Sequence, residues 1–257
     1  MTGANYTFNA LWGAVTCHRF CIPVWKVDTG LCACPSGSKA ATARPTPKSI
    51  TEMKQPTEGE LWEWRAFGRV SDSVAAAVRA FPIRMGMDNL RGEDLYFVSP
   101  FNDQNVKLRK AGARSFLKLK PLFEKDARSI ELYSDTATLE FNFPVSADRL
   151  LEAAGLLGVT LSDTRDAATV LDSDEFIQAM RACAPPLALV RVLKKRSQFE
   201  FPGGWFELAD ATFPRRQVES LSIHSPEKSV VEDMIERLNP GNEIEPMNYV
   251  EACRRWG

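Results

Sequence analysis

Basic side chains recur at every second position in three segments of this sequence. The pairs are Lys107 and Arg109, Lys118 and Lys120, and Lys194 and Arg196. In a β-strand, residues i and i+2 share a face, so both cations of a pair lie on one side of the strand and their apolar neighbours on the other. One such strand is typical of a solvated outer face, but two of these segments are adjacent in the chain and would form a hairpin.

Like charges that face each other across a hairpin repel, so the cations of these rows need compensation. Interleaved carboxylates or a bound polyanion would supply it. Glu63 lies two residues before Arg65, and other acids at strand positions are Glu131, Glu140, Glu207 and Glu219. If the basic rows point into a barrel, its low-dielectric walls concentrate the positive potential on a bound phosphate chain.

The hydrophobic pattern predicts the elements that position these residues. Strand-like alternation occurs at 60–69, 93–98, 104–110, 115–121, 129–133 and 137–145, and strands resume at 187–196, 198–202, 205–211 and 216–223. Helical spacing follows Ser73, Ser146 and Ser173. A last helix is expected after Ser225 as N-cap, with Pro226 at its first position. This order predicts an α+β fold with one closed or nearly closed antiparallel sheet.

The first fifty residues differ from the rest in composition. Residues 1–51 hold five basic residues and a single acid, Asp28, and 35–51 are mostly Ser, Thr, Ala, Pro and Lys. Such a segment buries too little apolar surface to order itself. It is interpreted as a disordered extension, as a transit-type peptide, or as residues upstream of a true start at Met53. The folded domain is therefore expected to span 53–257.

Four cysteines lie in that segment, at Cys17, Cys21, Cys32 and Cys34. Zinc sites usually take their ligands from two tight knuckles, whereas here the spacing is C-x3-C and then C-x-C. A zinc site and unstructured thiols both remain open.

Deletion of residues 1–52 is expected to leave the melting temperature within a few degrees of the full chain, because the segment has no apolar periodicity. Thermal unfolding of the two proteins side by side checks this. A collapse of solubility on deletion, or stoichiometric zinc in the full-length protein, would show that the segment is structured.

Composition excludes several classes of function. The formal net charge of −1 rules out a global polycation of the kind that coats nucleic acid. The chain has no apolar run of the roughly 18 residues that a membrane span needs, and no Gly-x-x-x-x-Gly-Lys phosphate loop. A cytoplasmic protein without membrane or specific nucleic-acid partners is expected.

From about Glu60 to Leu238 the order of elements resembles the CYTH superfamily, the triphosphate tunnel metalloenzymes. The segments that carry this likeness include Asp94–Tyr96, Asn105–Arg109, Phe116–Lys120, Thr138–Val145, Lys194-x-Arg196 and Val218-Glu219 before a Ser-Pro-Glu helix start. The resemblance implies an eight-stranded antiparallel tunnel-like β-barrel with flanking helices. It also implies a triphosphate-containing small molecule or polyphosphate as the ligand.

The resemblance assigns roles to particular side chains. The residues that would bind phosphate are Arg65, Lys107, Arg109, Lys118, Lys120, Lys194 and Arg196. The residues that would hold Mg²⁺ or Mn²⁺ are Glu63, Glu140, Glu207 and Glu219, with Glu63 and Glu219 acting in catalysis. The metal and carboxylates would orient a water that attacks a terminal phosphorus.

Several acids of the family pattern are absent. Leu61, Asn142 and Leu221 stand where carboxylates are expected. Three functions follow: a metal-dependent triphosphatase-like hydrolase acting on inorganic or organic triphosphate, a catalytically weak module that binds polyphosphate or nucleotide, or a structural barrel.

Overall fold

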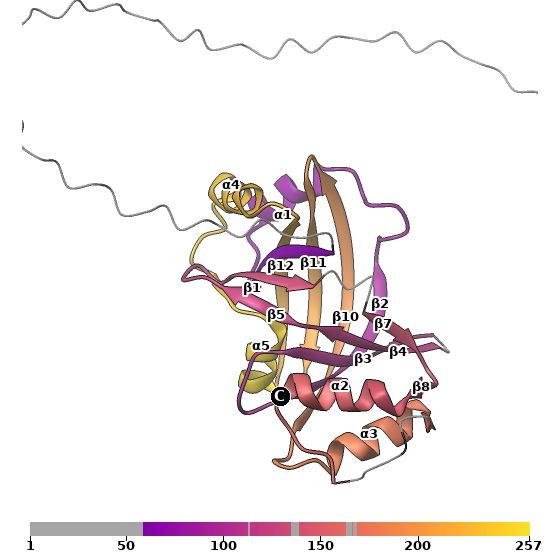
Figure 1. The fold of residues 1–257 in the computed structure, drawn as a ribbon. Helices are drawn as coiled ribbons and strands as arrows, with labels where there is room; N and C mark the ends of the chain where they lie inside the picture. The colour runs from indigo at the N-terminus through magenta and orange to yellow at the C-terminus, as the bar shows by residue number, and fades with distance from the viewer. Residues whose placement is uncertain (1–58, 113, 135–138, 163–165, 167–168) are drawn as a thin grey trace, which may run out of the picture. The chain divides into compact units, whose positions relative to one another are not determined.

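The computed structural model describes residues 59–257 except 113, 135–138, 163–165 and 167–168. The predicted 1–52 extension and its four cysteines lie outside the described residues. An antiparallel sheet dominates the fold and curls around a concave side (Figure 1). Its strands follow the order β5-β6-β1-β12-β11-β10-β2-β3-β4-β7, and β13 pairs with β1.

The strand bounds are as follows. They are β1 (Glu60–Gly68), β2 (Leu90–Val98), β3 (Asn105–Ala111), β4 (Arg114–Lys120), β5 (Leu122–Lys125), β6 (Ile130–Ser134), β7 (Glu140–Asn142), β8 (Val145–Ser146), β9 (Val170–Leu171), β10 (Ala188–Phe201), β11 (Gly204–Phe213), β12 (Arg216–Ser225) and β13 (Ile244–Pro246). The helices are α1 (Asp72–Arg79), α2 (Ala147–Leu157), α3 (Ser173–Arg181), α4 (Lys228–Leu238) and α5 (Tyr249–Trp256).

The α+β class is confirmed, but the expected closed eight-stranded barrel is wrong. The large sheet has eleven strands among the described residues, and its path ends at β5 and β7, which do not pair with each other. The strands at the two ends of the path, β5 and β7, are both short. β7 pairs with β4 over only three residues, and β5 pairs with β6 through a register irregularity between Leu122 and Glu124. Within the described ranges, the sheet is therefore curled but not closed, with β5 and β7 at its two edges.

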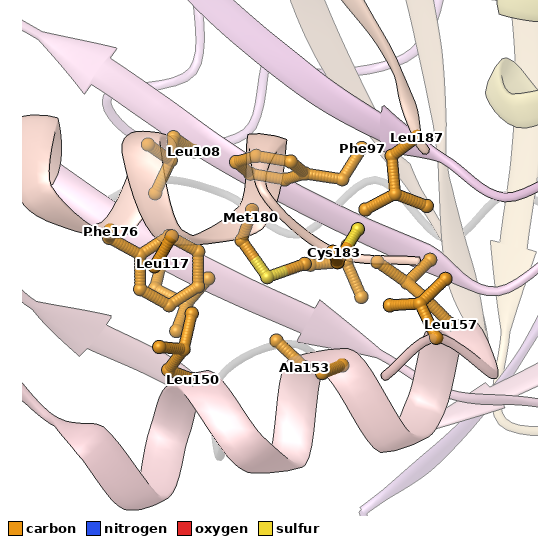
Figure 2. Packing of buried hydrophobic residues seen from close by; sticks show 14 of the residues in the cluster. Phe97, Leu108, Leu117, Leu150, Ala153, Leu157, Phe176, Met180, Cys183 and Leu187 are labelled. Atoms are coloured by element: carbon orange, nitrogen blue, oxygen red, sulfur yellow. The ribbon is translucent and has the colours of Figure 1, made fainter. Parts of the chain in front are cut away.

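Two apolar layers cover the convex face of the sheet. Figure 2 shows the first, in which α2 and α3 pack against β2, β3 and β4 through residues such as Leu150, Phe176, Leu108 and Leu117. The second joins α1 and α4 to β1, β6 and β12, with Trp64 among its buried residues. Because these apolar side chains face outward, the alternate residues of the same strands face the concave side.

Helix α5 packs on the concave side and fills one end of it. Its residues Tyr249, Cys253 and Trp256 form a core with inward residues of the strands, among them Phe67 and Tyr96. Asn248 caps the helix, and its side chain and that of Glu251 form a capping box. The concave side is consequently closed by apolar packing at the α5 end, while the β10–β11 hairpin lies at the opposite end (Figure 1).

Several predicted boundaries shift. The two segments at 187–196 and 198–202 form one strand, β10, and the described part of 137–145 contains the short β7 and the start of β8. The last predicted helix begins at Lys228 with Glu227 as N-cap, because Ser225 is still part of β12. The Ser225 hydroxyl accepts from the Glu227 backbone N–H at 3.0 Å and donates to the Gly203 carbonyl oxygen at 2.8 Å. Strand β5 and helix α5 were not predicted.

Candidate anion-binding site

The basic rows predicted from the sequence meet in one cavity of about 120 Å³ on the concave side. All seven predicted phosphate-binding residues line it: Arg65, Lys107, Arg109, Lys118, Lys120, Lys194 and Arg196. Two of the predicted carboxylates, Glu63 and Glu207, line it as well. The placement of these residues agrees with the sequence analysis, and their part in binding remains a prediction.

Asp94 is the carboxylate that gathers the cations nearest α5. It lies opposite Arg109 in the β2–β3 pairing, so the two side chains share the concave face. Arg109 Nε and Nη2 donate to the two carboxylate oxygens at 2.8 and 3.1 Å. Lys194 Nζ lies 2.8 Å and Lys107 Nζ 3.2 Å from Oδ2. Three buried or nearly buried cations thus share a single carboxylate that is 2% exposed.

Burial and crowding lower the proton affinity of the lysines in this cluster. Burial, with the neighbouring Arg109, outweighs the attraction of Asp94 and lowers the pKa of Lys194 to about 8. The pKa of Lys107 is lowered well below its ordinary value by burial and by the charges of Lys194 and Arg109. Asp94 alone does not offset the burial and mutual repulsion of these lysines. A bound anion would favour their charged forms.

A second group of charges lies on β1, β11 and β10. Arg65 Nε donates to Glu63 at 2.9 Å, and its Nη2 lies 3.3 Å from Glu207. Lys120 of β4 also binds Glu63, an ion pair that crosses the concave side because β4 and β1 are not neighbours in the sheet. Burial alone would raise the pKa of Glu63. The charges of Lys120 and Arg65 outweigh burial and hold this pKa well below its ordinary value, so the carboxylate is charged.

Two predicted metal ligands do not join this cavity. Glu140 lies on β7 opposite Lys118 and forms an ion pair with it. The prediction that Glu219 faces the cavity is wrong. The residues of β12 that face the concave side are Ser220, Ser222 and His224. The Glu219 carboxylate is exposed on the other face and accepts a hydrogen bond from the Val70 backbone at 2.8 Å. It therefore cannot share a metal ion or a catalytic step with Glu63.

The carboxylates on the cavity do not fit a divalent metal site. Mg²⁺ needs several oxygen ligands with uncompensated negative charge. Glu63 is bound by Arg65 and Lys120, while Glu207 is bound by Arg65, by Arg196 at 3.1 Å and by Gln198 at 3.0 Å. Among the described residues, no three His, Cys, Asp or Glu side chains form a group that could hold a metal ion. The lone pairs that a metal would need are already engaged by cations and an amide.

Sequence reasoning missed several residues of the site, among them Asp94, Tyr249 and His224. Asp94 carried a readable signal, since it alternates with Tyr96 on a strand whose hairpin partner holds Arg109. Tyr249 carried none, because it belongs to the unpredicted α5; Lys194 Nζ lies 3.3 Å from the centre of its ring. His224 also carried no signal, yet it lines the cavity, and its Nδ1 atom has no hydrogen-bond partner among the described residues.

No helix within the described ranges has the length and apolar character needed to cross a membrane.

Fold and site together define a curled antiparallel sheet with a cation-lined concave side. The sequence matches no protein-family model, and no curated protein matches it significantly. Solved structures do resemble it. A putative adenylyl cyclase from Hippeastrum, described as having a dominant triphosphatase activity, is 13% identical, with 76% of this chain and 95% of the other covered at a TM-score of 0.42.

Two further solved structures resemble the chain at similarly low sequence identity. A putative adenylate cyclase from Bacillus halodurans is 11% identical over 76% of this chain and 98% of its own, with a TM-score of 0.43. An inorganic triphosphatase, NE1496, is 13% identical over 72% of this chain and 83% of its own, with a TM-score of 0.31.

Proposed function

We propose that the concave side binds a phosphate-rich anion, such as triphosphate or the end of a polyphosphate chain, as a binding module rather than a metal-dependent hydrolase. The observation that carries the proposal is the excess of basic over acidic side chains: seven basic residues, buried or half-buried, line the cavity against two carboxylates, with Asp94 behind them. Charged groups of one sign, held in a low-dielectric cavity, attract a ligand of the other sign.

The donor geometry also suits phosphate oxygens. Charge-assisted hydrogen bonds from Lys and Arg to an anion are stronger than neutral ones, each worth about 1.5–3 kcal/mol. Arg196 and Lys118 are each paired with one carboxylate, and both line the cavity. Because a guanidinium has five N–H donors and an ammonium three, each can also donate to a phosphate oxygen.

The metal-dependent hydrolase is the less favoured of the two leading interpretations. Metal-dependent hydrolysis needs carboxylates that are free to hold the metal ion, and the Glu63 and Glu207 carboxylates are held by cations. Phosphate release from tripolyphosphate that depends on Mg²⁺ or Mn²⁺ would reverse this preference. Binding of tripolyphosphate in the presence of a chelator supports the binding module.

Tripolyphosphate is expected to stabilise the protein at low salt without added metal. A ligand at about 100 times its dissociation constant adds about 2.7 kcal/mol to the free energy of unfolding. Lys194→Met is expected to weaken tripolyphosphate binding by about 10- to 150-fold, because it removes one charge-assisted contact. Thermal unfolding with a titration of tripolyphosphate, followed by calorimetry, measures both effects.

Lys195 supplies the matched control. It is the next residue on β10, is exposed, and faces the convex side, so Lys195→Met removes the same charge without touching the cavity. Its affinity for tripolyphosphate is expected to stay within about twofold of the unmodified protein. Equal losses in both variants would mean that binding reflects net charge alone. No stabilisation by any polyphosphate in a folded sample would leave only the structural role.

A further inference from the structure

Glu131 of β6 is a buried carboxylate that lies beside the cavity. Its side chain is 3% exposed, and it is the pairing partner of Glu63 on β1, so both carboxylates face the concave side. Burial, together with the charge of Glu63, raises the pKa of Glu131. A carboxylate in such a place is stable only where several hydrogen-bond donors bind it.

Three donors from three elements surround this carboxylate. The Tyr133 hydroxyl of β6 donates to Glu131 Oε2 at 2.7 Å. The Asn248 side chain, which caps α5, donates through Nδ2 to Oε1 at 2.7 Å. Lys125 Nζ of β5 lies 3.3 Å from Oε1 and also binds Glu251 of α5 at 2.7 Å. Glu131 thus joins the first turn of α5 to the β5–β6 edge of the sheet.

Two of these contacts lead to cations of the cavity. Lys120 Nζ lies 4.0 Å from the centre of the Tyr133 ring. Tyr249 directly follows the N-cap residue of α5. Lys194 Nζ lies 3.3 Å and the guanidinium carbon of Arg65 4.7 Å from the centre of its ring. A cation over an aromatic face is attracted to it. Three of the seven basic residues that line the cavity therefore rest on rings that Glu131 holds directly or through α5.

The first turn of α5 depends on Asn248 in two ways. Its amide oxygen accepts from the Glu251 backbone N–H at 2.9 Å, which starts the helix, and its amide nitrogen donates to Glu131. Near the other end of α5, Arg254 binds backbone carbonyl oxygens of the loop between β2 and β3. The position of Tyr249, which belongs to the first turn, consequently follows from the contact between Asn248 and Glu131.

We infer that Glu131 is a positioning residue for anion binding, which fixes the Tyr133 and Tyr249 rings on which three of the cavity cations rest. The inference rests on the proposed function, because this positioning matters for binding only if those cations hold the anion. Long basic side chains that are already ordered lose less freedom when a ligand binds, so their preorganisation raises the affinity. Glu131 acts through these rings and does not itself contact the ligand.

The test reverses the polarity of the hydrogen bond between Asn248 and Glu131. Asn248→Asp has the same shape and keeps a capping oxygen, but it places a second carboxylate against Glu131. It is expected to weaken tripolyphosphate binding about 10-fold at about pH 7, because the released cations must then be ordered on binding. Calorimetric titration measures the dissociation constants.

The rescue variant combines Asn248→Asp with Glu131→Gln. The amide of the new glutamine side chain can donate to the new carboxylate, so the hydrogen bond returns with donor and acceptor exchanged and the net charge of the pair is unchanged. Its affinity for tripolyphosphate is expected to return to within about threefold of the unmodified protein.

The pH dependence of binding separates positioning from stability. The Tyr249 ring covers the Lys194 ammonium, and burial lowers the pKa of Lys194 to about 8. If Asn248→Asp releases Tyr249, that pKa rises toward its ordinary value of 10.5, and the pH above which the affinity falls is expected to rise by about one unit. The other titratable or charged groups near Lys194 are Asp94 and Tyr96 of β2, Lys107 and Arg109 of β3, Arg65 of β1 and Cys253 of α5.

Val231→Ala is the control for stability alone. Val231 is fully buried in the apolar layer under α4, so its truncation is expected to lower the melting temperature and to leave the pH dependence of binding unchanged. Asn248→Ser keeps a capping hydroxyl and removes the donor to Glu131, so it takes the place of Asn248→Asp if that variant does not fold.

Two results would refute the positioning role while the proposed function stands. One is a lower melting temperature of Asn248→Asp with the affinity and its pH dependence unchanged. The other is a folded double variant that does not regain affinity. If the unmodified protein does not bind tripolyphosphate, the proposed function fails and the positioning role fails with it.

Discussion

Replacing Asp94 by Asn is expected to lower the free energy of unfolding by about 3–5 kcal/mol, the cost of removing one partner from a buried ion pair. The carboxylate is 2% exposed and contacts Arg109, Lys107 and Lys194. Without it, these cations repel one another in a cavity that water screens poorly. Urea unfolding of the two proteins measures the difference.

The neighbouring Glu93 gives the control for this change. It lies on the other face of β2 and pairs with Arg191, which is largely exposed, so Glu93→Gln is expected to cost about 0–1 kcal/mol. Asp94→Asn with Lys107→Met removes one unpaired cation and is expected to recover part of the loss. Tripolyphosphate should stabilise Asp94→Asn more than the unmodified protein. A loss below about 1 kcal/mol would show that Asp94 does not hold the cluster together.

Anion binding is expected to take up protons and to weaken as the pH rises above about 8. The pKa of Lys194 is lowered to about 8, so above this pH the side chain is largely neutral in the ligand-free protein. A bound anion favours the charged form and raises that pKa again. For each proton taken up on binding, the affinity falls by up to about tenfold for every unit by which the pH rises.

The measurement is calorimetric titration with tripolyphosphate at about pH 8.5, in two buffers that differ in ionisation enthalpy, which reports the protons exchanged. Lys194→Met is expected to reduce the uptake. The ligand-free protein gives an independent check. Because the folded pKa of Lys194 lies below its ordinary value of 10.5, the unfolded chain binds more protons between those values, and this group makes stability rise with pH there. An affinity independent of pH from 7 to about 10 would contradict the assignment.

Period-two patterning was enough to predict which basic residues share the concave face. Lys118 and Lys120 alternate with Leu117 and Leu119, and the latter pair is buried against α2 and α3. The role of Glu219 was inferred from resemblance to an acidic strand and not from period-two patterning. The alternation of β12 places Ser220 and Ser222 on the concave face and Glu219 on the other.

Closure of the sheet could not be read from the strands alone. Whether β5 meets β7 depends on edge lengths and register across segments distant in sequence, and β7 is only three residues long. The role of α5 was hidden for a different reason. Tyr249, Cys253 and Trp256 form an apolar stripe of a single short helix, and nothing in its pattern says that it fills a concave sheet rather than covering a convex one.

The placement of α5 has a consequence for polymers. Apolar packing of Tyr249 and Trp256 with Phe67 fills the space beyond the cationic cluster, so a strand of linked phosphates cannot be threaded past it. A linear chain would reach Asp94 and its three cations only with a terminus. Under the proposed function, the protein would bind polyphosphate only at chain termini. The number of protein molecules bound by a given mass of polyphosphate would therefore fall as the chains lengthen.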